Sequence, residues 1–151
     1  MVTIGYDLDG VLLTDFDFRG LENGKHGVSI PEMLIVRRRL KPLFQPKSKY
    51  AIITGRPKDA VEETESWVEE YLDVKPTYLY ISGGIPLREE ASAKYKARCI
   101  KEVGLHTFIE SSAEIAELIV RELQVLRYSC YVATTQMMAS KGLGIIHGPM
   151  M

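Results

Sequence analysis

Short apolar runs typical of buried strands alternate along this chain with segments whose apolar residues recur at helical spacing. The strand signals fall at residues 2–6, 50–54, 77–82, 107–109 and 128–133. The helix signals fall between them, at residues 31–40, 57–71, 88–103 and 111–123. Strands separated by helices of this length pair in parallel through right-handed crossovers. The alternation therefore predicts an α/β fold, a three-layer sandwich with a central parallel sheet of about five strands and a Rossmannoid connection pattern.

Size and composition predict one domain over residues 1–151, with a polar flap at about residues 14–30. A chain of 151 residues has a common size for a single domain, and 46% hydrophobic with 26% charged residues matches an ordinary globular protein. The flap is irregular and is punctuated by Gly20, Gly24 and Gly27.

The charge balance and the N-terminal sequence argue against several classes of partner. A formal net charge of -1 supplies no overall field that would draw the protein onto nucleic acid or an anionic membrane. The apolar N-terminal stretch is interrupted by Asp7 and Asp9 and has no basic residue before it. It therefore predicts neither a signal peptide nor a membrane span, and we expect a cytoplasmic protein with no membrane partner.

Polar side chains stand where the predicted strands end. Four residues each close a strand: Asp7, Thr54, Ser82 and Glu110. In open parallel sheets, ligands bind outside the carboxyl ends of the strands. Asp7 and Asp9 are separated by one residue, so in an extended chain both face the same side. Two carboxylates at one site repel each other, and proteins usually compensate this repulsion by binding a divalent cation.

Four short motifs follow one another along the chain. The first is an apolar strand followed by DLDGVLL, which begins at Asp7. The second is Thr54 in AIITGRP, and the third is a lysine of ASAKYKARCIKEVG, either Lys94 or Lys96. The fourth is an acidic strand end, Glu110 in FIESSAE. In this order, over about residues 2–133, the motifs resemble those of the haloacid dehalogenase-like (HAD) superfamily.

The resemblance implies a Mg²⁺-dependent phosphatase that works through an aspartyl-phosphate intermediate. Asp7 would attack phosphorus as the nucleophile, and Asp9 would act as general acid and then as general base. Because the dehalogenases of the superfamily lack an acid at the second position, Asp9 favours phosphate over halide. The ligands of Mg²⁺ would be Asp7, the main-chain carbonyl of Asp9, and Glu110.

The resemblance also implies which residues bind the phosphoryl group. Lys96, in preference to Lys94, would neutralise the nucleophile and the transferring group, because the family's lysine commonly stands directly before an Ala-x-x-hydrophobic stretch. Thr54 and the backbone amide of Gly55 would donate hydrogen bonds to phosphoryl oxygens. Arg56 is expected either as a further phosphate contact or as the partner of an acid.

The fourth motif departs from the family, whose usual pattern has two acids, either adjacent or a few residues apart. Ser111 occupies the adjacent position. Glu114 has the spaced position, but Ser111 and Glu114 also match the S-x-x-E capping box of a helix start. We therefore expect a weakened metal site. The alternative to the enzyme is a non-catalytic or regulatory HAD-derived module that binds phosphate or metal.

The resemblance implies no cap domain, because the two positions at which caps are inserted hold only residues 14–30 and about 83–88. An open site of this kind resembles the capless group, which acts on large substrates or borrows a cover from a neighbouring subunit. A homo-oligomer is one interpretation of the methionine-rich tail, at Met137-Met138 and Met150-Met151, and a flexible terminus is the other.

The expected substrate is phosphorylated, either a small molecule or a nucleic-acid end. The run Arg37–Arg39 bears on this choice. We expect it to be the solvated face of the helix over residues 31–40, with a phosphate-binding or nucleic-acid patch as the alternative.

Overall fold

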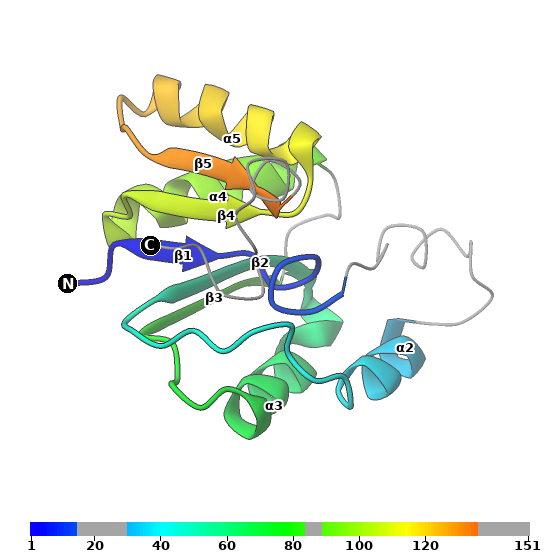
Figure 1. The fold of residues 1–151 in the computed structure, drawn as a ribbon. Coiled ribbons are helices and arrows are strands. Elements are labelled where there is room, and N and C mark those ends of the chain that lie inside the picture. The colour runs from blue at the N-terminus through cyan, green and yellow to red at the C-terminus, as the bar shows by residue number, and fades with distance from the viewer. Residues whose placement is uncertain (15–29, 84–88, 136–151) are drawn as a thin grey trace.

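The fold is built around a parallel sheet of five strands, which confirms the fold class predicted from the alternation of elements (Figure 1). The computed structural model describes residues 1–14, 30–83 and 89–135. The strands are β1 (Ile4–Tyr6), β2 (Ala51–Pro57), β3 (Tyr78–Gly83), β4 (Thr107–Glu110) and β5 (Tyr131–Thr134). They lie in the order β3-β2-β1-β4-β5, so β1 is central and its carboxyl end lies between those of β2 and β4.

Helices cover both faces of the sheet and complete the three layers (Figure 1). The helix α3 (Val61–Tyr71) packs on one face, and α4 (Glu89–Val103) and α5 (Ala113–Val125) pack together on the other. The short helix α2 (Ile30–Arg37) contacts η1 (Lys58–Ala60), a 3-10 turn that leads from β2 into α3.

Alternate residues of the central strands enter two separate hydrophobic cores. Ile52 of β2 packs in the core that contains Trp67 of α3. Ile53 of β2 and Phe108 of β4 pack in the opposite core, with Ile100 of α4. Strands buried on both faces read as continuous apolar runs, which is why the sequence signals for this sheet are clear.

The second strand ends later than predicted. It continues from Thr54 to Pro57, and its pairing with β3 shifts register between these two residues. Pro57 is extended, with ψ at 171°, so it ends the strand instead of opening the helix. The helix α3 therefore begins at Val61, after the 3-10 turn.

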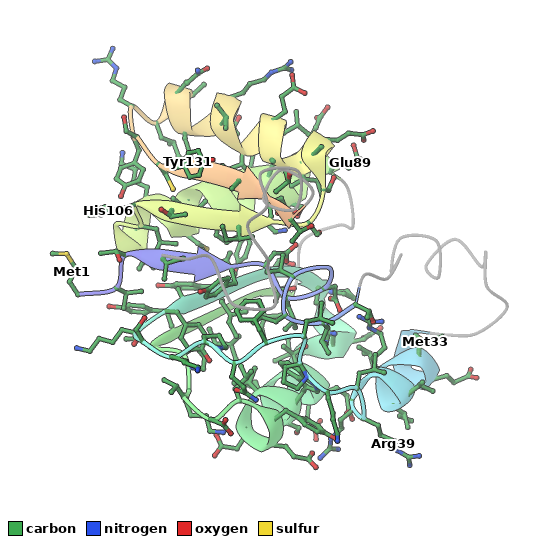
Figure 2. All side chains as sticks on the ribbon, in the orientation of Figure 1. Met1, Met33, Arg39, Glu89, His106 and Tyr131 are labelled. Atoms are coloured by element: carbon green, nitrogen blue, oxygen red, sulfur yellow. The ribbon has the colours of Figure 1, made fainter. Side chains whose placement is uncertain are left out.

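The expectation that Arg37 lies on the solvated face of its helix is wrong. Arg37 is 4% exposed and Leu34, one helical turn before it, is 1% exposed. Residues three apart share a face of a helix, so Arg37 points inward with Leu34. Arg38 and Arg39 are exposed, and Figure 2 shows Arg39 on the outside of the molecule.

The N-cap predicted for the last helix is also wrong, because the structure places it one residue later. The N-cap of α5 is Ser112, whose Oγ accepts the backbone N–H of Ile115 at 3.2 Å. Ser111 and Glu114 therefore form no capping box, and the Glu114 side chain is exposed. The change matters because Ser111 lies in the site described below.

Several predicted features lie outside the described residues. They are most of the flap at 14–30, the second cap position at 84–88 and the methionine pairs of the tail. Within the described ranges, no helix has the length and apolar character needed to cross a bilayer.

Candidate active site

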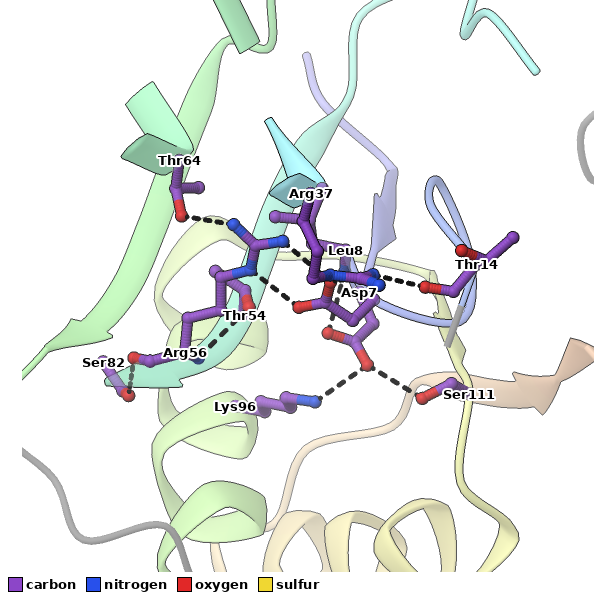
Figure 3. Close-up of polar contacts among 11 residues, drawn as sticks. Asp7, Leu8, Thr14, Arg37, Thr54, Arg56, Thr64, Ser82, Lys96 and Ser111 are labelled. Carbon is purple, nitrogen blue, oxygen red and sulfur yellow. Dashed lines mark hydrogen bonds and ion pairs between the residues drawn. The ribbon is translucent and has the colours of Figure 1, made fainter. Parts of the chain in front are cut away.

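The carboxyl ends of the central strands and one face of α4 bring three predicted motif residues together, of which Figure 3 labels Asp7 and Lys96. Asp7 directly follows β1, Glu110 is the last residue of β4, and Lys96 comes from α4. The Lys96 ammonium lies 3.2 Å from Asp7 Oδ2 and 2.7 Å from Glu110 Oε1. Burial alone would lower the pKa of Lys96, but the two acids raise it, so the lysine stays charged. We call these three residues the acidic part of the site.

The turn after β1 fixes the position of Asp7. The backbone N–H of Asp7 donates to the carbonyl of Ile109 at 2.9 Å, which joins the end of β1 to β4. The carbonyl of Leu8 accepts the N–H of Leu12 at 2.9 Å, and both side chains are buried. Gly10 allows this tight turn because its φ of 89° is unfavourable for other residues.

The structure places Lys96, and not Lys94, beside the acids. Ala93, Ala97 and Ile100 form the buried face of α4, and Lys96 shares it at 2% exposure. Lys94 lies on the exposed side of the same helix. The apolar spacing of α4 thus directs one of the two lysines into the site.

Ser111 occupies the position where the HAD motif pattern that the sequence resembles has a second acid. Its Oγ lies 3.2 Å from both Asp7 Oδ2 and Glu110 Oε2. Glu110 Oε2 also accepts the backbone N–H groups of Ser111 and Ser112, at 3.0 and 3.1 Å. A neutral hydroxyl therefore links two carboxylates where a third would add repulsion.

Asp9 points into a second part of the site, formed with Arg37 and Arg56 and called here the basic part. Arg56 donates from Nε to Asp9 Oδ2 at 2.7 Å and from Nη2 to Oδ1 at 2.8 Å. Arg37 Nη2 donates to the same Oδ1 at 2.7 Å and to the Thr14 carbonyl. Arg56 Nη1 also donates to Thr64 Oγ1 at 2.9 Å. Of the two roles expected for Arg56, the structure shows the pairing with an acid.

The sequence reasoning missed Thr14 and Thr64 as site residues, and it included Arg37 only as part of an alternative phosphate-binding or nucleic-acid patch. A signal exists for two of them, because Arg37 is spaced as a buried residue from Leu34 and Thr64 lies one turn before buried Trp67. Nothing in the spacing of Thr14 indicates that its carbonyl accepts a hydrogen bond from an arginine.

Burial and neighbouring charges shift the two aspartates in opposite directions. Burial and the charge of Glu110 raise the pKa of Asp7 to about 8. Burial alone would also raise the pKa of Asp9, but the charges and hydrogen bonds of Arg56 and Arg37 lower it below its ordinary value. Asp9 is therefore kept as a carboxylate, while Asp7 readily retains a proton.

The second motif lies where β2 approaches α4. Thr54 is 1% exposed, and its Oγ1 accepts the backbone N–H of Arg56 at 3.2 Å. A Cβ on Gly55 would lie 2.7 Å from Ser92 Oγ, so glycine permits the close approach of the strand to the helix. Ser82, at the end of the third predicted strand, donates to the Arg56 carbonyl at 2.8 Å and supports that residue's backbone.

The side chains at the site are of the types that bind a magnesium ion, although they do not surround one completely. Among the described residues, no group of three or more His, Cys, Asp or Glu side chains is placed to hold a metal ion. Mg²⁺ is commonly bound by only one or two carboxylates, with water and a substrate phosphate completing its shell. Asp7 and Glu110 can supply two such carboxylates, because an oxygen of each already contacts the same cation, the ammonium group of Lys96.

The chain matches none of the protein-family models, curated proteins or solved structures with which it was compared. The function of the site is therefore inferred from its geometry and from the motif pattern.

Proposed function

We propose that this protein is a HAD-type phosphatase that hydrolyses a phosphate monoester through an aspartyl-phosphate on Asp7. The main support is the contact of one ammonium group, Lys96, with carboxylates from two other motifs, Asp7 and Glu110. The fourth participant, Asp9, belongs to the same turn as Asp7. This combination supplies a nucleophile, a charge-neutralising lysine and an acid at the carboxyl end of a parallel sheet.

In the first step, an oxygen of Asp7 attacks phosphorus and the bond from phosphorus to the leaving alcohol breaks. Leu8 N–H donates to Asp7 Oδ1 at 2.8 Å, while Ser111 and Lys96 contact Oδ2 at 3.2 Å. Asp7 must lose its proton before it attacks, and the positive charge of Lys96 favours the ionised form. A carboxylate fixed in this way is then oriented for in-line attack. Lys96 also offsets the negative charge that gathers on the transferring group.

The arginines hold Asp9 as a carboxylate in the free protein, so Asp9 must take up a proton from solvent when substrate binds. It then protonates the leaving alcohol and, as carboxylate again, activates the water that hydrolyses the intermediate. General acid-base help of this kind is typically worth about 10²–10⁴-fold in rate. Thr54 and the backbone amide of Gly55 bind phosphoryl oxygens, since a hydroxyl that accepts one hydrogen bond can still donate its own proton.

When bound, Mg²⁺ would neutralise negative charge on the phosphoryl oxygens and on the nucleophile. Asp7 and Glu110 are the side chains that would hold it. The main-chain carbonyl of Asp9 is the further ligand that the resemblance implies.

A non-catalytic module that binds phosphate or metal is the second candidate. Two observations favour it: both oxygens of Asp9 are engaged by arginines, and Ser111 replaces the second acid. Such a module would bind phosphate or Mg²⁺ without turnover.

Within the enzyme class, a small phosphorylated molecule is better supported than a nucleic-acid end. Arg37 is buried, and Arg38 lies 3.6 Å from Glu63 and 4.0 Å from Glu70, so acids oppose the basic run. The two substrate classes differ in their response to salt, because contacts to a nucleic-acid backbone weaken steeply as the salt concentration rises.

The proposal is tested by phosphate release from a broad panel of aryl phosphates and phosphorylated metabolites with Mg²⁺. We expect turnover by the wild type and a loss of at least about 10³-fold in Asp7→Asn. The matched control is Asp59→Asn, at an exposed acid of η1, which should keep full activity. A folded protein that binds Mg²⁺ in calorimetry but turns over nothing on the panel would instead support the binding module.

A further inference from the structure

The edge of the sheet along β3 has no neighbouring strand among the described residues. β3 stands at one end of the strand order, and its other side pairs with β2. Just before β3, the backbone N–H of Thr77 donates to the Tyr50 carbonyl at 2.9 Å. Successive residues of a strand direct their backbone groups to alternate sides. Tyr78, Tyr80 and Ser82 therefore direct their N–H and C=O groups outward, away from β2.

This edge lacks the features that usually prevent strands from pairing. Exposed edges are commonly protected by charged residues, by proline or by short length. β3 has six residues, Tyr78–Gly83, and contains neither a charged residue nor a proline. Tyr78 is 43% exposed, and its ring stacks on that of Tyr80 with centroids 6.0 Å apart and planes 7° apart. The edge thus presents outward backbone groups beside a flat aromatic surface.

The opposite edge of the sheet, along β5, is less suited to pairing. The N–H of Tyr131 donates to the His106 carbonyl at 2.8 Å, so the outward residues of this four-residue strand are Val132 and Thr134. A partner strand would therefore form fewer hydrogen bonds along β5 than along β3.

The helix beside β3 carries two opposite charges. α4 contacts both β2 and β3, and its residues Arg98 and Glu102 are exposed. Burial and the nearby Glu102 carboxylate raise the pKa of Tyr80, so Glu102 faces the β3 side of α4. Arg98 shares this side, because residues four apart lie on one face of a helix. The ion pairs of the described residues involve other side chains.

A second copy of this chain matches the strand edge and the charges in one arrangement. When two β3 strands pair antiparallel about a two-fold axis at Tyr80, the two Tyr80 residues face each other and Tyr78 faces Ser82. Each of these pairs exchanges both backbone hydrogen bonds. The same axis makes the two α4 helices antiparallel at about 10–14 Å, a separation that side chains span. Arg98 of each copy then faces Glu102 of the other, so the surface is complementary to itself.

We propose that this protein forms a homodimer by antiparallel pairing of β3 with β3 of a second copy, which makes one continuous sheet across both subunits. The opposite charges on α4 identify a second copy as the occupant of this edge, because the two-fold axis pairs each charge with its opposite. The inference is independent of the proposed function, since none of the residues that carry it belongs to the acidic or the basic part of the site.

The test measures molar mass by light scattering and dimer affinity by sedimentation equilibrium. We expect the wild type to have twice the mass of one chain at about 0.1 mM, since interfaces of ordinary size give micromolar or tighter dissociation constants. Arg98→Glu places like charges opposite each other and should weaken dimerisation at least about tenfold. The double variant Arg98→Glu/Glu102→Arg should restore the affinity to within about threefold. The matched control is Lys101→Glu, on the α5 side of α4, which should dimerise as the wild type does.

Two substitutions at Tyr78 test whether the strand backbones pair. Tyr78→Pro removes an outward N–H without removing a hydrogen bond to β2, whereas Tyr78→Ala removes the ring and keeps the N–H. We expect Tyr78→Pro to weaken dimerisation about tenfold more than Tyr78→Ala does. Equal effects of the two substitutions would reject strand pairing.

A monomeric wild type at about 0.1 mM would overturn the inference. A dimer that withstands both Arg98→Glu and Tyr78→Pro would also overturn it, because its interface would lie elsewhere, as along β5. If the double variant did not reverse the effect of Arg98→Glu, the contact with Glu102 of the second copy would be rejected, and with it the arrangement about Tyr80.

Discussion

Lys96 compensates two buried carboxylates at once, from the buried face of α4. Lys96→Met should lower the free energy of unfolding by about 3–5 kcal/mol at neutral pH, because Asp7 and Glu110 would remain buried without their cation. The measurement is urea denaturation. Lys94→Met, on the exposed side of the same helix, should change stability by less than about 0.5 kcal/mol.

The cause can be checked by repeating the Lys96→Met measurement at acid pH. Protonation of Asp7 removes its repulsion with Glu110, so the loss of stability should shrink. A loss of equal size at both pH values would indicate that packing of the lysine chain, and not its charge, is responsible.

At the residue scale, the sequence identifies the groups that stand at strand ends but not their partners. Asp7 and Glu110 follow from their position at strand ends, and Lys96 follows from the motif pattern that the sequence resembles. The partners of Asp9 do not, since Arg37 and Arg56 lie 28 and 47 residues away along the chain. A run of three arginines is typical of a solvated face, and only the packing of α2 shows that its first member turns inward.

At the scale of elements, two adjacent serines at the start of α5 have different tasks. Ser112 caps the helix, so Ser112→Ala should cost about 1 kcal/mol of stability and leave phosphatase activity nearly unchanged. Ser111 contacts Asp7, the proposed nucleophile, so Ser111→Ala should lower kcat roughly tenfold. Thermal unfolding and steady-state kinetics on both variants check this, and an exchange of the two effects would contradict the assignment.

The packing of β2 on α4 depends on the absence of a side chain at Gly55. Gly55→Ala should destabilise the protein by about 1–3 kcal/mol, because the added Cβ would lie 2.7 Å from Ser92 Oγ. Ser92→Ala should restore much of this loss in the double variant, as measured by chemical denaturation. Failure of the second substitution to restore stability would show that the strand backbone, and not this contact, requires glycine.

Element boundaries were less predictable than the elements themselves. The hydrophobic periodicity of α5 is local, but its cap depends on which of two serines points toward Asp7. Likewise, Pro57 is compatible with the first position of a helix, yet its pairing with Gly83 of β3 keeps it in the strand. In both cases a long-range contact decided between local alternatives.

For the whole molecule, stability should pass through a maximum in mildly acid solution. The folded-state pKa of Asp9 is lowered, so Asp9 stabilises the fold fully above its ordinary pKa of 3.8. This stabilisation is lost as the pH falls through the lowered pKa of the folded state. The folded-state pKa of Asp7 is raised to about 8, so protonated Asp7 stabilises the fold fully below its ordinary pKa of 3.8. This stabilisation is lost as the pH rises toward 8. Urea unfolding across this range measures the profile.

The matched variants separate the two limbs of this profile. The Asp7→Asn variant has no titratable group at position 7, so it should lose less stability than the wild type between mildly acid pH and about pH 8. It should still lose stability at lower pH as the wild type does. Asp59→Asn, at an exposed acid, should reproduce the wild-type profile. An alkaline decline that persists in full in Asp7→Asn would assign it to other groups.

The sequence by itself determined the parallel α/β architecture, because burial of both faces of a sheet imposes a local pattern of apolar strands and amphipathic helices. It also determined which strand ends carry acids. Only the tertiary structure decided how the charges combine, with Lys96 between Asp7 and Glu110 and two arginines on Asp9. The physical reason is that burial and pairing of charges depend on distances between elements, whereas periodicity depends only on neighbours along the chain.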